Sequence, residues 1–293
     1  MDLSSLTPLE GGWSGQTFLA QVAGERSVVR IYPPGRRDDA APEIDAAVLR
    51  LVRGLVPVPD VLEVRRGDAD ADQPGLLVTS YLPGERGDLL LPELSDADAG
   101  RLGHCVGAVL ADLAGMPTLR FGPFVDADLT IGDFGVPDGL PGFVATRADA
   151  LGWDVDLLDG LVRVAELAQE RLDTVGRTCV VHSDANPKNL LVDSATLTVT
   201  GLLDWEFAHS GCPVSDLGNM LRFDRRPAFA DAVLAAWCER RGTDPAETLA
   251  RARAADLWAL IDLAARRGEN PVAERAHDHL RAIARTGDLH ALP

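Results

Sequence analysis

The chain has 293 residues, 46% of them apolar, which is enough to bury a sizeable core in one large domain or in two lobes that share a cleft. Its formal charge of −17 opposes binding to nucleic acid and favours a cationic partner, although acidity can also serve solubility alone. Without a run of about 18 apolar residues no membrane span is expected, no secretory signal is expected at the start, and the four scattered cysteines indicate reduced thiols in a cytoplasmic protein.

The first part of the chain predicts short strands. Compact or alternating apolar runs are separated by glycine-rich breaks, which is the pattern of a small sheet. These runs cover residues 7–12, 16–24, 25–33, 56–66 and 74–84. Between the third and the fourth run, residues 42–53 place apolar side chains at helical spacing, so one helix is expected there.

The rest of the chain predicts helices. Ser95 and Asp98 form a capping box ahead of the apolar residues up to 116, and Pro245 follows Asp244 as at the start of a helix. Helices are also expected at 154–175 and over most of 249–284, with one β interruption at 178–206. We therefore expect an α+β fold with a small antiparallel-sheet lobe at residues 1–82 and a larger, mainly helical lobe at residues 83–293.

The β interruption carries the side chains that suggest chemistry. An apolar strand leads into a polar loop with His182, Asp184 and Asn189, and a second apolar ribbon ends on Asp204. Transfer of a phosphoryl group to an alcohol needs a carboxylate near the attacking hydroxyl and oxygen ligands for Mg²⁺. Asp184 can accept the proton of the hydroxyl, while Asn189 and Asp204 offer oxygen atoms that suit a hard cation. The ribbon is expected to fold Asp204 back beside Asn189.

These residues resemble the aminoglycoside phosphotransferase family, which is related to choline kinase and the protein kinases. The family pattern is H-x-D-x-x-x-x-N, an apolar hairpin and a D-x-E or D-x-D element, and the chain has H-S-D-A-N-P-K-N followed by D-W-E. The resemblance implies a protein-kinase-like fold, ATP and Mg²⁺ as cofactors, Asp184 as the catalytic base, His182 as a brace of the loop, and Asn189 and Asp204 as Mg²⁺ ligands. Asp216 matches the family residue that braces this loop from behind. The alternative is that these residues only shape polar turns.

The resemblance also implies a nucleotide site on the smaller lobe. Ser14 and Gly15 lie in a glycine-rich segment that could approach phosphate, although a hairpin turn explains the segment equally well. Arg30 ends a strand where protein kinases carry a phosphate-binding lysine, and its planar fork can do the same task. Its acidic partner is expected on the next helix, either Asp45 or Glu43. The alternative is that each is simply an acid in the first turn of a helix, where the helix dipole favours negative charge.

A hinge is expected where the last strand of the smaller lobe ends. Thr79, Ser80 and Tyr81 would offer main-chain groups to adenine, and a strand that leads into a Pro-Gly turn fits the same residues.

The function expected from the resemblance is phosphorylation of a hydroxyl on a small, cationic antibiotic, an aminoglycoside or a cationic peptide, with resistance as the outcome. A choline, homoserine or sugar kinase and a catalytically silent kinase-like binding module are the alternatives. We expect a monomer or weak dimer. Acids on the later helices are candidates for binding the acceptor. They are Asp154, Asp156, Asp159, Asp256, Asp262 and Glu269.

Overall fold

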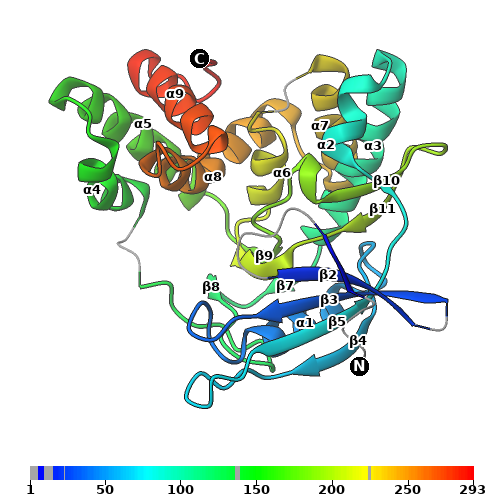
Figure 1. The fold of residues 1–293 in the computed structure, drawn as a ribbon. Coiled ribbons are helices and arrows are strands. Elements are labelled where there is room, and N and C mark those ends of the chain that lie inside the picture. Colours follow the sequence, from blue (N-terminus) through cyan, green and yellow to red (C-terminus); the bar gives the residue numbers. More distant parts are fainter. Residues whose placement is uncertain (1–5, 10–15, 23, 136–138, 224–225) are drawn as a thin grey trace.

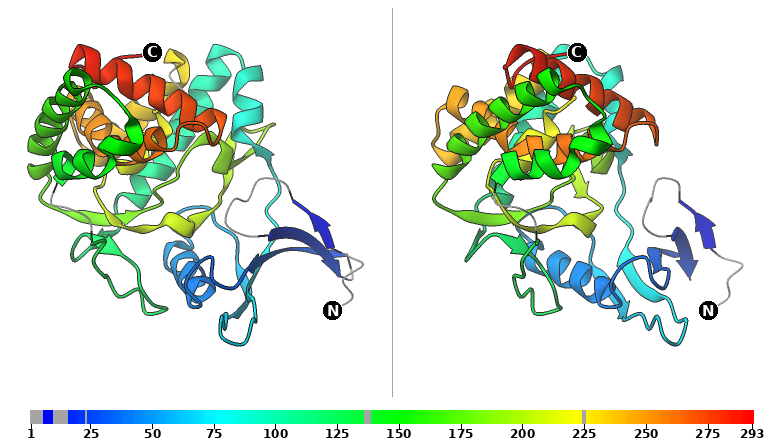
Figure 2. Two further views of the ribbon diagram at one scale, coloured as in Figure 1. Left: turned by 60° about the vertical axis from the view of Figure 1, so that its left-hand side comes forward. Right: turned by 90° about the vertical axis from the view of Figure 1, so that its left-hand side faces the viewer.

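The protein has two lobes that match the expected α+β class. The computed structural model describes residues 6–9, 16–22, 24–135, 139–223 and 226–293. In Figures 1 and 2 a twisted sheet with one helix lies below a larger lobe built mainly of helices. The lobe boundary at residue 82 stays a prediction.

Five strands form the sheet of the smaller lobe, in the order β1-β2-β3-β5-β4, and each neighbouring pair is antiparallel. They are β1 (Leu6–Pro8), β2 (Gln16–Val22), β3 (Glu25–Tyr32), β4 (Val61–Arg65) and β5 (Gly75–Ser80). Helix α1 (Ala41–Val52) has Pro42 in its first turn, where a backbone N–H would have no intrahelical partner. Its apolar face, including Val48 and Val52, packs with Leu77 of the sheet.

Helices α3 (Asp96–Leu113) and α7 (Pro227–Arg241) lie side by side in the larger lobe (Figure 1). Ser95 caps α3 by accepting the N–H of Asp98, as the sequence predicts. A Cβ atom at Gly103 would lie 2.5 Å from the carbonyl oxygen of Phe229, and one at Gly107 would lie 2.2 Å from that of Val233. The two helix backbones can therefore approach closely only because these positions carry no side chain.

A second apolar core joins the remaining long helices. Its helices are α4 (Gly139–Leu151), α5 (Val155–Asp173), α8 (Pro245–Ala265) and α9 (Pro271–Thr286). The predicted helical tail is thus two helices, because α8 ends at Ala265 and Asn270 caps a new start. Of the helices that the structure describes, none is both long and apolar enough to cross a membrane.

Two small sheets lie between the lobes, and they carry more strands than the sequence predicts. One has the order β11-β10-β6 and the other β7-β9-β12-β8. Their strands are β6 (Glu85–Arg86), β7 (Pro117–Thr118), β8 (Gly122–Pro123), β9 (Thr178–Val181), β10 (Leu190–Asp193), β11 (Thr198–Leu202) and β12 (His209–Gly211). The expected single β interruption is therefore wrong, because β6, β7, β8 and β12 are too short to show a periodic pattern and pair with segments far along the chain.

Short helical turns complete the larger lobe. They are α2 (Gly87–Leu90), η2 (Leu91–Glu93), η3 (Pro187–Asn189), η4 (Trp205–Phe207) and α6 (Ser215–Met220). Helix α1 of the smaller lobe contacts η4, so the two lobes meet at the turn that follows Asp204.

Candidate active site

His182 holds the polar loop that follows β9. Its side chain is completely buried, and its ring packs edge-on against Trp205 with 4.6 Å between centroids. Nε2 lies 2.8 Å from the carbonyl oxygen of Leu203, and Nδ1 accepts the N–H of Asp184 at 3.2 Å. Burial lowers the pKa of His182 to about 4. The imidazole is therefore neutral at pH 7, with its proton on Nε2, and it ties the loop to the segment before Asp204.

Asp216 holds the same loop from the other side. Its two carboxylate oxygens accept the backbone N–H groups of His182 and Ser183, each at 2.8 Å. Ser183 has a positive φ of 69°, a conformation that a non-glycine residue keeps only when its surroundings fix it. Burial raises the pKa of Asp216 to about 6, against the opposing effect of the two N–H donors.

Replacing Asp216 by asparagine should destabilise the protein and slow its reaction. The amide can accept only one of the two N–H groups, and its NH₂ would face the other donor. Leaving one buried donor unsatisfied costs about 1–3 kcal/mol. We expect a loss of that size in urea unfolding, together with a lower kcat and an unchanged KM for the nucleotide. An unchanged kcat in the folded variant would contradict the role of Asp216 in shaping the loop.

Asp184 projects from this loop and is partly buried. Its Oδ1 accepts the amide of Asn186 and its Oδ2 accepts the amide of Asn189, both at 2.8 Å. Burial raises the pKa of Asp184, and the hydrogen bond from Asn189 opposes that rise. The two amides fix the direction of a carboxylate that binds protons more tightly than usual, as a group that takes a proton from a hydroxyl must.

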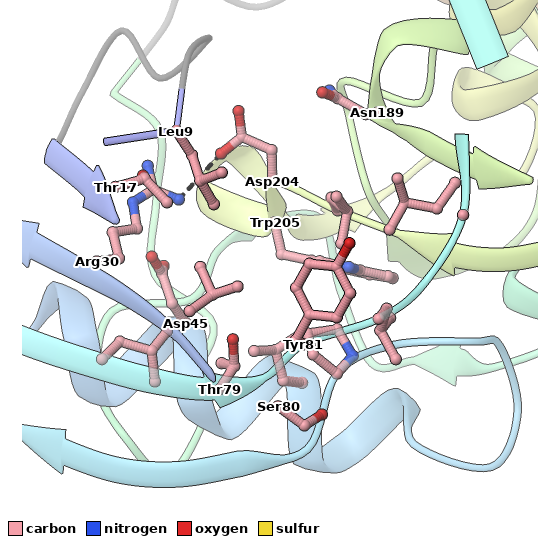
Figure 3. Close-up of a pocket in the computed structure, with 18 of the residues that line it drawn as sticks. Leu9, Thr17, Arg30, Asp45, Thr79, Ser80, Tyr81, Asn189, Asp204 and Trp205 are labelled. Carbon is pink, nitrogen blue, oxygen red and sulfur yellow. Dashed lines mark hydrogen bonds and ion pairs between the residues drawn. The ribbon is translucent and has the colours of Figure 1, made fainter. Parts of the chain in front are cut away.

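Asn189 and Asp204 meet as the ribbon predicts. Strands β10 and β11 pair antiparallel, and the N–H of Leu203 donates to the carbonyl oxygen of Asn189 at 2.8 Å. Asp204 is in the left-handed region, with φ at 67°, which turns its side chain out of the strand direction. Figure 3 shows both side chains directed at one cavity.

The oxygen atoms of Asn189 and Asp204 fit a magnesium ion that also binds phosphate. Mg²⁺ commonly takes one or two protein oxygens and completes its shell with phosphate and water. Within the described residues, no cluster of three or more His, Cys, Asp or Glu side chains is placed to hold a metal. An ion at this site would therefore depend on a phosphate ligand to complete its coordination.

The cavity between the lobes has a volume of about 370 Å³ and a mainly apolar lining. The predicted residues on its wall are Arg30, Asp45, Thr79, Ser80, Tyr81, Asn189 and Asp204. Two main-chain donors of the predicted hinge are engaged within the protein: the N–H of Ser80 donates to Asp60 and that of Tyr81 to Arg26. Adenine contacts through these two N–H groups would have to replace those bonds. The predicted Ser14 and Gly15 lie outside the described residues.

Arg30 has different partners from those expected. Its guanidinium forms ion pairs with Asp204, at 2.9 Å, and with Glu206. Among the described residues, the ion pairs of Asp45 go to Arg37 and those of Glu43 to Arg66 at the surface. The expected pairing with an acid of α1 is therefore wrong, because the turn after β11 brings two carboxylates closer.

Some of the acids that are candidates for binding the acceptor already contact other groups of the protein. Asp256 forms a buried ion pair with Arg222, and Asp262 is paired with Arg147 and Arg266. Asp154, in turn, caps α5. These three carboxylates thus have partners within the protein, and their part in binding an acceptor stays a prediction.

Arg37 and Glu206, which pair with Asp45 and Arg30, have no role in the sequence-based prediction. Glu206 is the last residue of the D-W-E element, in which the resemblance gives a role to Asp204 alone. Arg37 lies in an irregular segment between β3 and α1, where no periodic pattern points to it.

Comparisons with known proteins identify the family and the fold. A family model described as a phosphotransferase enzyme family matches residues 5–255. No curated protein matches the sequence.

Solved structures share the fold. A thermostable mutant of aminoglycoside phosphotransferase APH(4)-Ia, in a ternary complex with ADP and hygromycin B, is 20% identical with a TM-score of 0.69; the match covers 97% of this chain and 94% of that one. A mutant of aminoglycoside 2'-phosphotransferase-IIIa in complex with GDP is 19% identical with a TM-score of 0.69, over 99% and 94% of the two chains. A putative aminoglycoside phosphotransferase from Ralstonia eutropha JMP134 is 19% identical with a TM-score of 0.66, over 96% and 90%.

Proposed function

The chain belongs to the phosphotransferase enzyme family, and from this premise we propose that it transfers the γ-phosphoryl group of ATP to a hydroxyl of a small, cationic antibiotic. The observation that carries the proposal is the meeting of Arg30, Asn189 and Asp204 on the wall of the interlobe cavity, with Asp184 hydrogen-bonded to Asn189 just behind that wall. These are the groups that phosphoryl transfer needs: a base, oxygen ligands for a metal and a cation for phosphate.

Each residue has one task in the proposed reaction. Asp184 orients the acceptor hydroxyl and takes its proton as the oxygen bonds to the γ-phosphorus and the bond to the leaving ADP breaks. Asn189 and Asp204 would hold Mg²⁺, which offsets negative charge on the phosphates when bound. Arg30 presents a guanidinium to the phosphates. His182 and Asp216 keep the loop in shape and touch neither reactant.

The acceptor class rests on charge and on likeness to relatives. A formal charge of −17 attracts polycations, and one structural relative carries hygromycin B beside ADP. An aminoglycoside or a cationic peptide antibiotic fits both, and its phosphorylation would confer resistance. A silent binding module is less well supported, because Asp184, Asn189 and Asp204 are all present, with Asn189 and Asp204 on one cavity wall and Asp184 hydrogen-bonded to Asn189.

The test is ADP release from Mg-ATP in the presence of a panel of aminoglycosides, cationic peptide antibiotics, choline, homoserine and sugars. Turnover with one class of antibiotic, and slower growth of cells that lack the gene when that antibiotic is present, would support the proposal. Turnover with choline, homoserine or a sugar, and with none of the antibiotics, would show that the acceptor is a metabolite and not an antibiotic. Failure to bind Mg-ATP would overturn the proposed activity.

The rate should fall at acidic pH because Asp184 must be ionised to act as a base. Its pKa is raised, so the acidic limb of kcat should lie above the ordinary carboxylate value of 3.8. Asn186→Ala removes one amide donor to the carboxylate and should move the limb to higher pH. The measurement is kcat against pH within the range where circular dichroism shows a folded protein. A limb at or below 3.8 would contradict the role of Asp184.

A further inference from the structure

Two guanidinium groups and three carboxylates meet where the smaller lobe touches the turn at residues 204–206. Arg30 pairs with Asp204 at 2.9 Å and with Glu206. Arg37 pairs with Asp45 at 2.7 Å, lies 3.9 Å from Glu206 Oε2, and donates to the carbonyl oxygen of Glu206 at 3.3 Å. Glu206 thus contacts both arginines and forms the centre of the network.

The acid of α1 is already committed to other partners. Both oxygens of Asp45 accept from Arg37, at 2.7 and 3.0 Å, and Tyr32 donates to Oδ2 at 2.7 Å. This fork-to-fork contact is bidentate, and the Asp45 side chain is only 6% exposed. Asp45 is therefore oriented toward Arg37, and its influence on Arg30 is through space.

The two carboxylates that Arg30 contacts differ in their surroundings. Asp204 lines the cavity and its side chain is 28% exposed, whereas that of Glu206 is 5% exposed and is not part of the cavity wall. In the proposed reaction Asp204 serves a metal ion, so it cannot also hold Arg30 throughout. Glu206 does not line the cavity, so its contact with the guanidinium can persist when a nucleotide and a metal ion occupy that cavity.

We propose that Glu206 is the positioning residue of Arg30, holding its guanidinium toward the nucleotide phosphates, and that Asp45 acts on Arg37 instead. The inference rests on the proposed function, since it assigns Arg30 to phosphate. Arg37 then links α1 to the 204–206 turn, so that the helix and the turn keep a fixed distance. The buried carboxylate supplies a permanent partner for a cation that must face a cavity.

A double-mutant cycle on nucleotide binding tests this. The probe is Mg-AMP-PNP, with its dissociation constant measured by calorimetry at saturating Mg²⁺. Glu206→Gln and Arg30→Gln should each weaken binding by about 10- to 100-fold, the range for a hydrogen bond to a charged group. The double variant should bind no worse than Arg30→Gln within about threefold, because the two residues act as a unit. For Asp45→Asn combined with Arg30→Gln, the fold-changes in the dissociation constant should instead multiply, because the two residues act independently.

One control variant and the possible outcomes separate the explanations. Glu63→Gln removes an exposed carboxylate of β4 and should leave binding unchanged. The proposal would be overturned if the fold-changes in the dissociation constant caused by Glu206→Gln and Arg30→Gln multiply in the double variant. It would also be overturned if Arg30 is coupled to Asp45 and not to Glu206. If Glu206→Gln needs a higher Mg²⁺ concentration for binding, and its effect is the same with and without Arg30, Glu206 is a metal ligand and the proposal is overturned. A parent protein that does not bind Mg-AMP-PNP would fail at the first step, which marks failure of the proposed function itself.

Discussion

Replacing Asp184 by alanine is expected to lower kcat by about 10²- to 10⁴-fold, the usual contribution of a positioned general base. The carboxylate is held by two amides, from Asn186 and Asn189, and burial keeps its affinity for protons high. Alanine removes the group that would take the proton from the hydroxyl. Asp184 does not line the nucleotide cavity, so the KM for ATP should change little.

Steady-state kinetics with the best acceptor of the panel would measure this effect. Asp70→Ala, in an exposed turn of the smaller lobe, removes the same group far from the loop and should retain parental kinetics. Urea unfolding of both variants checks that the fold survives. A kcat within about tenfold of the parent would mean that Asp184 only shapes a turn, and the proposed chemistry would need another base.

Replacing Asp256 by alanine is expected to cost about 3–5 kcal/mol of unfolding free energy, the usual penalty for breaking a buried ion pair. Arg222 donates to the two oxygens of Asp256 at 2.9 and 2.7 Å, and both side chains are less than a tenth exposed. Removing the carboxylate takes away the ion pair and the two hydrogen bonds that Asp256 accepts from a buried guanidinium. Because α6 carries Asp216 and also packs on α8, the same loss should loosen the support of the polar loop.

The matched control is the double change Arg222→Met with Asp256→Leu. Both charges disappear and similar volume remains, so stability should return to within about 1–2 kcal/mol of the parent or exceed it. Urea unfolding of the two variants gives the comparison. A double variant as unstable as Asp256→Ala would show that the cost comes from lost packing rather than from an uncompensated charge.

Elements that depend on neighbouring residues could be predicted from the sequence. The caps at Ser95, Asp154 and Asp244 each accept an N–H three residues ahead, a contact that needs no tertiary structure. The meeting of Asn189 with Asp204 was also predictable, because a short antiparallel ribbon brings its two ends together.

Contacts between distant segments could not be predicted in the same way. The partner of Arg30 lies more than 170 positions away, and choosing Glu206 over Asp45 depends on how the lobes meet. The resemblance pointed to Asp45 or Glu43 on α1, but the sequence could not show that Arg37 would bind the Asp45 carboxylate. The two-residue strands β7 and β8 could not be predicted for a related reason. Two residues show no periodic pattern, and these segments are strands only because they pair with β9 and β12.

The close contact of α3 with α7 changes how relatives of this protein should be compared. Gly103 and Gly107 lie where any side chain would strike a carbonyl oxygen of the opposite helix. Neither residue lines the interlobe cavity. Relatives that keep this close helix pair must keep glycine at both positions, whatever small molecule they act on. Invariance there would record ancestry of the scaffold, and substrate preference would have to be traced through positions that are free to vary.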